Sequence, residues 1–159
     1  MDGETQKMKS QIAMLFFFTS ICVACDSSRL TFNNVAELKA SDAYERWIPL
    51  GVVVLGATEI EASKHSGLVR IKYKYDGERP LSIDGMRPLK AEYVARATGY
   101  YPKIEELAPK MSIQFRCNRH TVAPKDDPKA IMVFFDVEFV GDTGKDVYYW
   151  NSELEEAYF

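Results

Sequence analysis

This sequence has few cysteines, few histidines and no excess of positive charge. Of its three cysteines, Cys22 and Cys25 lie near the start and only Cys117 lies in the body of the chain, which leaves that body without a pair for a disulfide. Two histidines provide little for acid–base catalysis or metal binding. The formal net charge of −3 at pH 7 argues against nucleic acid as a partner, because such proteins carry basic surfaces.

The short motifs of common catalytic and phosphate-binding sites are also missing. No Gly-Xaa-Ser-Xaa-Gly, His-Glu-Xaa-Xaa-His, glycine-rich phosphate loop or EF-hand spacing occurs. Cys117 and His120 are three residues apart on a predicted strand, so they face opposite sides and do not form a nucleophile–base pair. The sequence offers no second pair of ligands for zinc. We therefore expect a protein that is not an enzyme and that has no cofactor and no metal site.

The overall composition of the chain is typical of one folded domain. Hydrophobic residues make up 47% of the chain, aromatic residues 13% and charged residues 27%. These fractions are typical of a globular protein and exclude global disorder. A length of 159 residues fits a single domain.

One apolar run without charges lies near the start of the chain. Residues 1–11 are polar and include two lysines, residues 12–24 carry no charge, and Cys25 follows. This order is typical of a secretory signal peptide, and the run is shorter than the roughly 20 residues that span a bilayer. Three consecutive phenylalanines without a polar face argue against an amphipathic helix. Acidic residues before Met8 leave both Met1 and Met8 open as the true start.

Val23-Ala24-Cys25 resembles the lipobox of bacterial lipoproteins, in which a small residue precedes a cysteine that is acylated and becomes the new N-terminus. The resemblance implies a signal peptide over residues 1–24, lipidation at Cys25, and a soluble domain that is held at a membrane and faces the periplasm. Two or three acyl chains make such an anchor stable, since each buried methylene contributes about 0.8 kcal/mol. Asp26 resembles the inner-membrane retention signal of enterobacterial lipoproteins; inner and outer membrane both stay open.

After a tether over residues 25–32, the pattern predicts one soluble α+β domain over residues 33–159. Asn33 or Asn34 is a suitable N-cap for a helix over about residues 34–46, which we expect to pack on a mainly antiparallel sheet of five to six strands. One or two helical turns are expected over residues 102–110. Alternation of apolar and polar residues predicts strands at 52–62, 68–75, 91–100, 112–119, 130–140 and 146–150.

Strands 112–119 and 130–140 are predicted to pair as an antiparallel hairpin with one buried face. That face would consist of Ile113, Phe115, Cys117, Val133, Phe135, Val137 and Phe139. Cys117 is then a small buried hydrophobic residue, and its thiol should react slowly.

Arg70, Lys72 and Lys74 alternate with apolar residues, so a strand would place all three cations on one face. This ridge either pairs with acidic residues of neighbouring strands or binds an anion or an acidic partner. Arg96 and Arg116 would extend it. Its candidate partners, which are also the candidate carboxylates of a cell-envelope hydrolase, are Glu59, Glu61, Asp136 and Glu138.

Tyr148, Tyr149 and Trp150 form a cluster that either closes the end of a core or, if exposed, binds a partner. Residues 47–49, followed by residues 56–60, are similar to a Trp-Pro step before a strand in uncharacterised bacterial lipoproteins. The main hypothesis is a membrane-tethered envelope lipoprotein that binds a protein partner, as an accessory, assembly or immunity-type factor, through this cluster or through the ridge. The alternatives are a cell-envelope hydrolase and a lipoprotein that binds a small anionic ligand.

Overall fold

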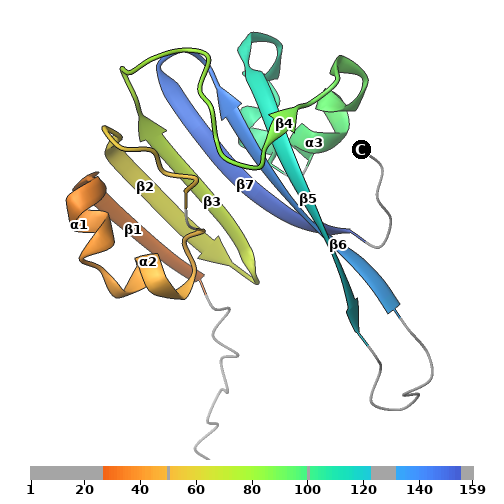
Figure 1. Ribbon diagram of the computed structural model, residues 1–159, viewed down its shortest axis with the longest axis horizontal. Helices are drawn as coiled ribbons and strands as arrows, with labels where there is room; N and C mark the ends of the chain where they lie inside the picture. The colour runs from red at the N-terminus through yellow and green to blue at the C-terminus, as the bar shows by residue number, and fades with distance from the viewer. Residues whose placement is uncertain (1–26, 50, 100, 123–131, 155–159) are drawn as a thin grey trace, which may run out of the picture.

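The computed structural model describes residues 27–49, 51–99, 101–122 and 132–154, which form a seven-stranded antiparallel sheet (Figure 1). The strand order is β1-β2-β3-β7-β6-β5-β4, so the last strand of the chain lies in the middle of the sheet. This confirms the predicted α+β class with an antiparallel sheet, but the sheet has seven strands and not the five to six expected, because β1 and the short β4 were not predicted as strands. The strands are β1 (Ser27–Asn34), β2 (Thr58–His65), β3 (Leu68–Lys74), β4 (Arg87–Pro88), β5 (Ser112–Val122), β6 (Met132–Asp142) and β7 (Asp146–Leu154).

The helical segments are short, and the continuous helix expected over residues 34–46 is wrong. Asn34 is the N-cap, as expected, and its side chain accepts a 3.0 Å hydrogen bond from the Glu37 amide. The helix then breaks at Ser41, whose hydroxyl donates to the Leu38 carbonyl at 2.6 Å and so competes with the helical backbone. The segments are α1 (Val35–Lys39), α2 (Asp42–Arg46), α3 (Val94–Gly99) and the 3₁₀ turns η1 (Ala91–Tyr93), η2 (Pro102–Ile104) and η3 (Ala108–Lys110).

Three segments differ from the expectation, whereas the helical turns over residues 102–110 are confirmed. Residues 27–32, expected to be part of a tether, belong to β1 and pair with β2. The strand expected at 52–62 begins only at Thr58, because residues 52–57 form a loop that follows Gly51 and contains Gly56, and both glycines have positive φ. The strand expected at 91–100 is helical where described, in keeping with the helix propensity of its alanines.

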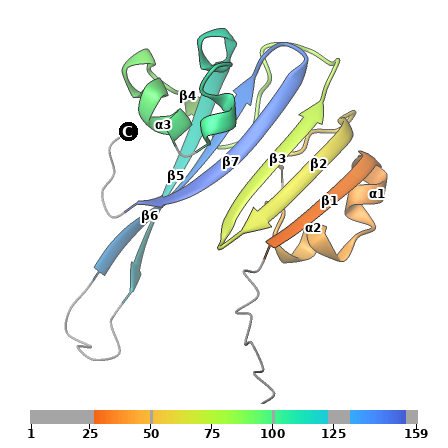
Figure 2. The same ribbon diagram turned by 180° about the vertical axis from the view of Figure 1, so that it is seen from behind.

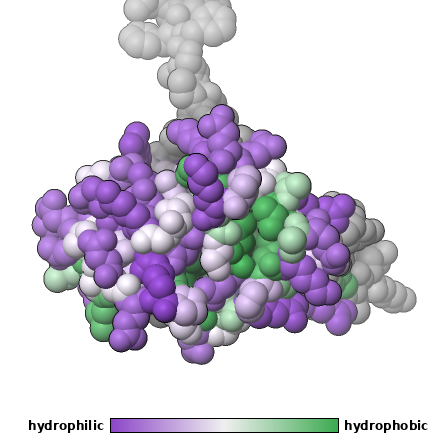
Figure 3. Space-filling model, turned by 90° about the horizontal axis from the view of Figure 1, so that it is seen from above, coloured by the Kyte–Doolittle hydropathy of each residue, from purple (hydrophilic) through white to green (hydrophobic). Residues whose placement is uncertain are grey.

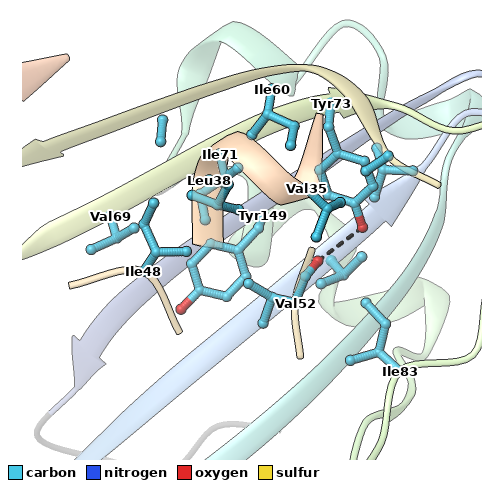
Figure 4. Close-up of a cluster of buried hydrophobic side chains, with 14 of the residues drawn as sticks. Val35, Leu38, Ile48, Val52, Ile60, Val69, Ile71, Tyr73, Ile83 and Tyr149 are labelled. Carbon is cyan, nitrogen blue, oxygen red and sulfur yellow. Dashed lines mark hydrogen bonds between the residues drawn. The ribbon is translucent and has the colours of Figure 1, made fainter. Parts of the chain in front are cut away.

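Both faces of the sheet carry a hydrophobic cluster. The α1 face, named for the helix packed on it, contains Ile60, Ile71, Tyr73 and Tyr149 together with Leu38 from α1 (Figure 4). On this face the Tyr73 hydroxyl donates a 2.9 Å hydrogen bond to the Val52 carbonyl, which fixes the loop over residues 52–57. The opposite face, the α3 face, has a separate cluster that includes Val137, Phe139, Tyr148, Trp150, Ala97 and Ile104.

The two helical layers cover different halves of the sheet. Helices α1 and α2 lie against β1, β2 and β3 on one side (Figure 1), and α3 with its neighbouring turns lies against β5, β6 and β7 on the other (Figure 2). The α3 face of β1, β2 and β3 therefore lacks a helix among the described elements. Seen from above, most of the surface is hydrophilic, and the larger apolar area lies near the middle of this face (Figure 3).

Strands β5 and β6 form the predicted antiparallel hairpin, with Phe115 opposite Phe139 and Cys117 opposite Val137. The predicted set lies on one face, but its burial decreases toward the far end of the hairpin. Ile113, Phe115, Val137 and Phe139 are buried, and Cys117, Val133 and Phe135 are half-buried. The far end extends beyond the layer formed by α3 (Figure 2), which explains the partial exposure.

Candidate anion-binding site

The predicted cationic ridge is present on β3. Arg70, Lys72 and Lys74 lie on the α3 face, and the residues between them are buried on the α1 face. Lys74 and Lys72 both have acidic neighbours. Lys74 Nζ lies 2.5 Å from a Glu59 carboxylate oxygen, and Lys72 Nζ lies 3.8 Å from Asp146 Oδ1. Lys74 is therefore committed to an ion pair within the sheet.

A hollow of about 210 Å³ opens on the α3 face beside this ridge. Liquid water occupies about 30 Å³ per molecule, so the hollow has room for about seven waters or for a small polar group. It is the place where the open part of the face meets the segment after α3. The residues that line it are Arg29, Glu61, Ala62, Ser63, Arg70, Lys72, Tyr101 and Lys103.

Four of these lining residues are cations and one is an anion, and a second carboxylate, that of Asp146, lies 3.8 Å from Lys72 Nζ. Arg29 and Glu61 form an ion pair at 3.2 Å, but their side chains are 76% and 50% exposed, and pairs of this kind contribute roughly 0–1 kcal/mol. Lys103 has no ion-pair partner within the described part of the chain. Positive side chains therefore outnumber negative ones around the hollow.

Tyr101 connects the hollow to the core. The Arg70 guanidinium carbon lies 4.7 Å from the centroid of the Tyr101 ring, within the range of a cation–π contact. The same ring meets Trp150 edge to face at 6.4 Å, and the Trp150 indole donates a 2.9 Å hydrogen bond to the Ala97 carbonyl in α3. Burial raises the pKa of the Tyr101 hydroxyl, so this wall of the hollow is uncharged at neutral pH.

The aromatic cluster near the C-terminus does not form an exposed edge. Tyr148, Tyr149 and Trp150 are only 9%, 1% and 0% exposed, so the alternative, in which they pack inward, is the one observed. Successive residues of a strand point to opposite faces, and all three are buried because β7 lies in the centre of the sheet, between β3 and β6. Tyr148 and Trp150 lie opposite Lys72 and Arg70 of the ridge, and Lys72 Nζ is 5.7 Å from the centroid of the Tyr148 ring.

The carboxylates considered for a hydrolase do not converge. Glu59 and Glu61 lie on β2, whereas Asp136 and Glu138 lie on β6, and two strands separate β2 from β6. Glu138 accepts hydrogen bonds from the Tyr149 hydroxyl at 3.0 Å and from Arg116 Nε at 2.6 Å. A glycosidase-like pair needs two carboxyl groups on either side of one bond, and this arrangement does not provide it.

Two further expectations about the ridge are corrected. Arg116 does not extend it, because Arg116 is bonded to Glu138 and to the Asp84 carbonyl, next to Tyr149 of the α1 face. Arg96 lies on α3 and does not line the hollow.

The described residues contain no group of three or more His, Cys, Asp and Glu side chains placed to hold a metal ion. Cys117 is half-buried, and burial raises the pKa of its thiol, which disfavours the reactive thiolate. Within the described ranges no helix has the length and apolar character needed to cross a membrane. The predicted signal peptide and Cys25 lie outside these ranges.

Three of the residues that line the hollow, Arg29, Tyr101 and Lys103, are not predicted from the sequence. Arg29 falls within the expected tether, although Leu30 and Phe32 alternate with polar residues in the manner of a strand. Tyr101 and Lys103 follow α3 and reach the ridge only because the Trp150 contacts hold that segment on the sheet. No local pattern in the sequence indicates this approach.

No protein family, curated protein or solved structure matches this chain.

Proposed function

We propose that this protein is a membrane-tethered envelope lipoprotein that binds an anionic ligand in the hollow and catalyses no reaction. The observation that carries the proposal is the convergence of four cations from β1, β3 and η2 around one hollow whose lining contains one carboxylate, Glu61, with Asp146 beside Lys72. Guanidinium groups bind carboxylates and phosphates in a bidentate manner, and lysines add compact positive charge. Like charges gathered in this way repel one another, and a bound anion relieves that repulsion.

The anchor is supported by the lipobox-like sequence that ends at Cys25. We expect the mature protein to lack residues 1–24 and to carry acyl chains on Cys25, which intact-mass measurement of the membrane-extracted protein will detect. A Cys25→Ala variant should lose the lipid and appear in soluble fractions. An unchanged membrane partition of that variant would contradict the anchor.

Anion binding is tested on the acylated protein in nonionic detergent. Inorganic phosphate should raise its melting temperature more than chloride at equal ionic strength, because a ligand that binds only the folded state stabilises it. A variant with Arg70→Gln and Lys72→Gln should lose this difference. The matched control, Lys39→Gln with Arg46→Gln, removes the same charge from α1 and α2 and should keep it. Equal phosphate effects in the two variants would refute a site in the hollow.

A protein partner is the second candidate function, and a specific observation favours it. Leu55 is 77% exposed at the tip of an apolar loop that also contains Val53 and Val54, and large exposed apolar side chains often mark interaction sites. A photo-crosslinking residue at Leu55 should capture one discrete protein in intact cells. The same residue at exposed Lys110, on η3, should not. Identical products from the two positions would contradict this candidate.

A further inference from the structure

The two edges of the sheet differ in how they are protected. At one edge the two-residue β4 contains Pro88, which has no backbone N–H, and the part of β5 beyond β4 carries Arg116 and Arg119. Short strands, prolines and charged side chains all discourage an edge from pairing with another chain. The strand at the other edge, β1, has eight residues, which include neither proline nor glycine and only one charged side chain, that of Arg29. The β1 edge therefore lacks most of this protection.

The outer side of β1 presents backbone groups to a further strand. Among the described strands β1 pairs only with β2 (Figure 2), and none of its residues 28–34 is buried. The Asn33 amide donates a 2.7 Å hydrogen bond to a carboxylate oxygen of Glu37 and takes no part in the pairing with β2. Backbone groups along a strand point alternately to its two sides. The N–H and C=O groups of Arg29 and Thr31 therefore point to the same side as the Asn33 amide, away from β2.

Leu30 adds an apolar side chain in the middle of this edge. It lies opposite Ala62 on the α1 face and is 37% exposed, and Leu55 is the other exposed large hydrophobic residue in the described ranges. Arg29 and Thr31, on either side of Leu30, point to the α3 face, where Arg29 is paired with Glu61 at 3.2 Å. The α1 side of the edge is therefore apolar at its centre and free of charge.

We propose that two copies of this chain pair through β1, antiparallel to each other, with Leu30 opposite Leu30 of the second copy on a twofold axis. Arg29 then lies opposite Thr31 of the second copy, and their outward N–H and C=O groups bond to one another on both sides of the axis. The two leucines form the closer, non-hydrogen-bonded kind of pair, with Cα atoms about 4.5 Å apart. The two seven-stranded sheets become one continuous sheet, and the twofold axis closes the assembly at two copies.

The hydrogen bonds favour this register over its neighbour. A shift that placed Thr31 on the axis would set Arg29 opposite Asn33 of the second copy, and the Asn33 amide is already bonded to Glu37. A second copy also brings the same exposed leucine to the same point of the edge, so each copy covers the apolar side chain of the other. The inference concerns β1 alone, and it depends neither on the anchor nor on the hollow.

Self-association is tested by sedimentation equilibrium of the full acylated protein in density-matched nonionic detergent. The average mass should rise from one copy toward two as the protein concentration increases, because a contact of one strand pair is smaller than a typical stable interface. Leu30→Lys should keep the mass of one copy, because two like charges would lie directly opposite each other. Leu55→Lys changes the other exposed leucine in the same way and should associate like the wild type. A wild-type mass of one copy at every concentration, or association lost in Leu55→Lys and kept in Leu30→Lys, would overturn the inference.

Cysteine crosslinking with copper phenanthroline tests the register, and the wild-type chain with its own cysteines gives the background. A disulfide needs Cα atoms within about 7 Å, so Leu30→Cys should form covalent dimers. Ser28→Cys is the matched control on the same face of β1. In the proposed register the two residues 28 are offset by four positions, or about 13 Å along the strand, and should give several-fold less dimer. Equal yields from the two variants would contradict the register and the inference.

The role of the outward amides is tested in the Leu30→Cys background. Thr31→Pro removes one of the amides that the second strand needs, whereas Thr31→Val keeps it. Proline is tolerated in an edge strand at a position whose N–H side faces solvent, and the melting temperature checks that both variants fold. Crosslinking should be lost in Thr31→Pro and kept in Thr31→Val. Crosslinking that persists in a folded Thr31→Pro variant would show that the copies meet in some other way.

Discussion

Replacing Trp150 with phenylalanine tests the link between the core and the hollow. Trp150 is 0% exposed, stacks on Phe139 at 5.3 Å, and donates a 2.9 Å hydrogen bond to the Ala97 carbonyl. Phenylalanine keeps an aromatic ring but has no donor, which leaves a buried carbonyl unpaired at a cost of about 1–3 kcal/mol. The smaller ring also leaves a cavity beside Tyr101. The free energy of unfolding should therefore fall by about 2–4 kcal/mol.

Urea denaturation followed by circular dichroism measures this loss, with Trp47→Phe as the matched control. Trp47 is only half-buried. Replacing it with another aromatic residue should lower the free energy of unfolding by less than about 1.5 kcal/mol. Because the smaller ring packs less closely against Tyr101, Trp150→Phe should also weaken the phosphate-dependent rise in melting temperature, and Trp47→Phe should not. Equal losses of stability in the two variants would refute the role given to Trp150.

Three further predictions concern single groups. Asn34→Ala removes the N-cap of α1 and should lower the free energy of unfolding by about 1 kcal/mol, measured in urea; no change would mean that water replaces the cap. Cys117 should react with a thiol reagent much more slowly in the folded than in the unfolded protein, because burial raises its pKa and the thiolate is the reactive form; equal rates would contradict its position. Burial also raises the pKa values of Tyr73 and Tyr149, so the folded state favours their protonated forms, and stability should fall as the pH rises above about 10. Ultraviolet titration in which all nine tyrosines ionise together in the folded protein would contradict this.

Strand positions were predictable where burial follows a period of two. Arg70, Lys72 and Lys74 alternate with buried residues of β3. In the β5–β6 hairpin the predicted residues lie on the same face of the sheet. A strand with one polar and one apolar face can pair in only one register that buries its apolar side chains. The same period of two predicts a strand over residues 91–100, but residues 91–99 are helical. Alternation over so few residues does not separate a strand from a short helix that packs by its alanines.

The central place of β7 was not predictable from its own sequence. Tyr148, Tyr149 and Trp150 are consecutive aromatic residues without a polar face, which suits a strand buried on both sides. The same pattern also suits an exposed aromatic edge. The choice depends on β7 pairing with β3 and β6 at once, and this pairing joins segments more than 70 residues apart in the sequence.

The same long-range pairing creates the candidate site. β7 brings Trp150 opposite Arg70, and Trp150 in turn holds α3 and Tyr101 against the sheet. Lys103, two residues after Tyr101, reaches the hollow for that reason, whereas Arg29 reaches it from the other side through the pairing of β1 with β2. A cation in the hollow can therefore be neutralised with little effect on folding, but loss of the Trp150 contacts should disturb folding and the hollow together. Comparing Lys103→Gln with Trp150→Phe separates the charge of the hollow from the packing that builds it.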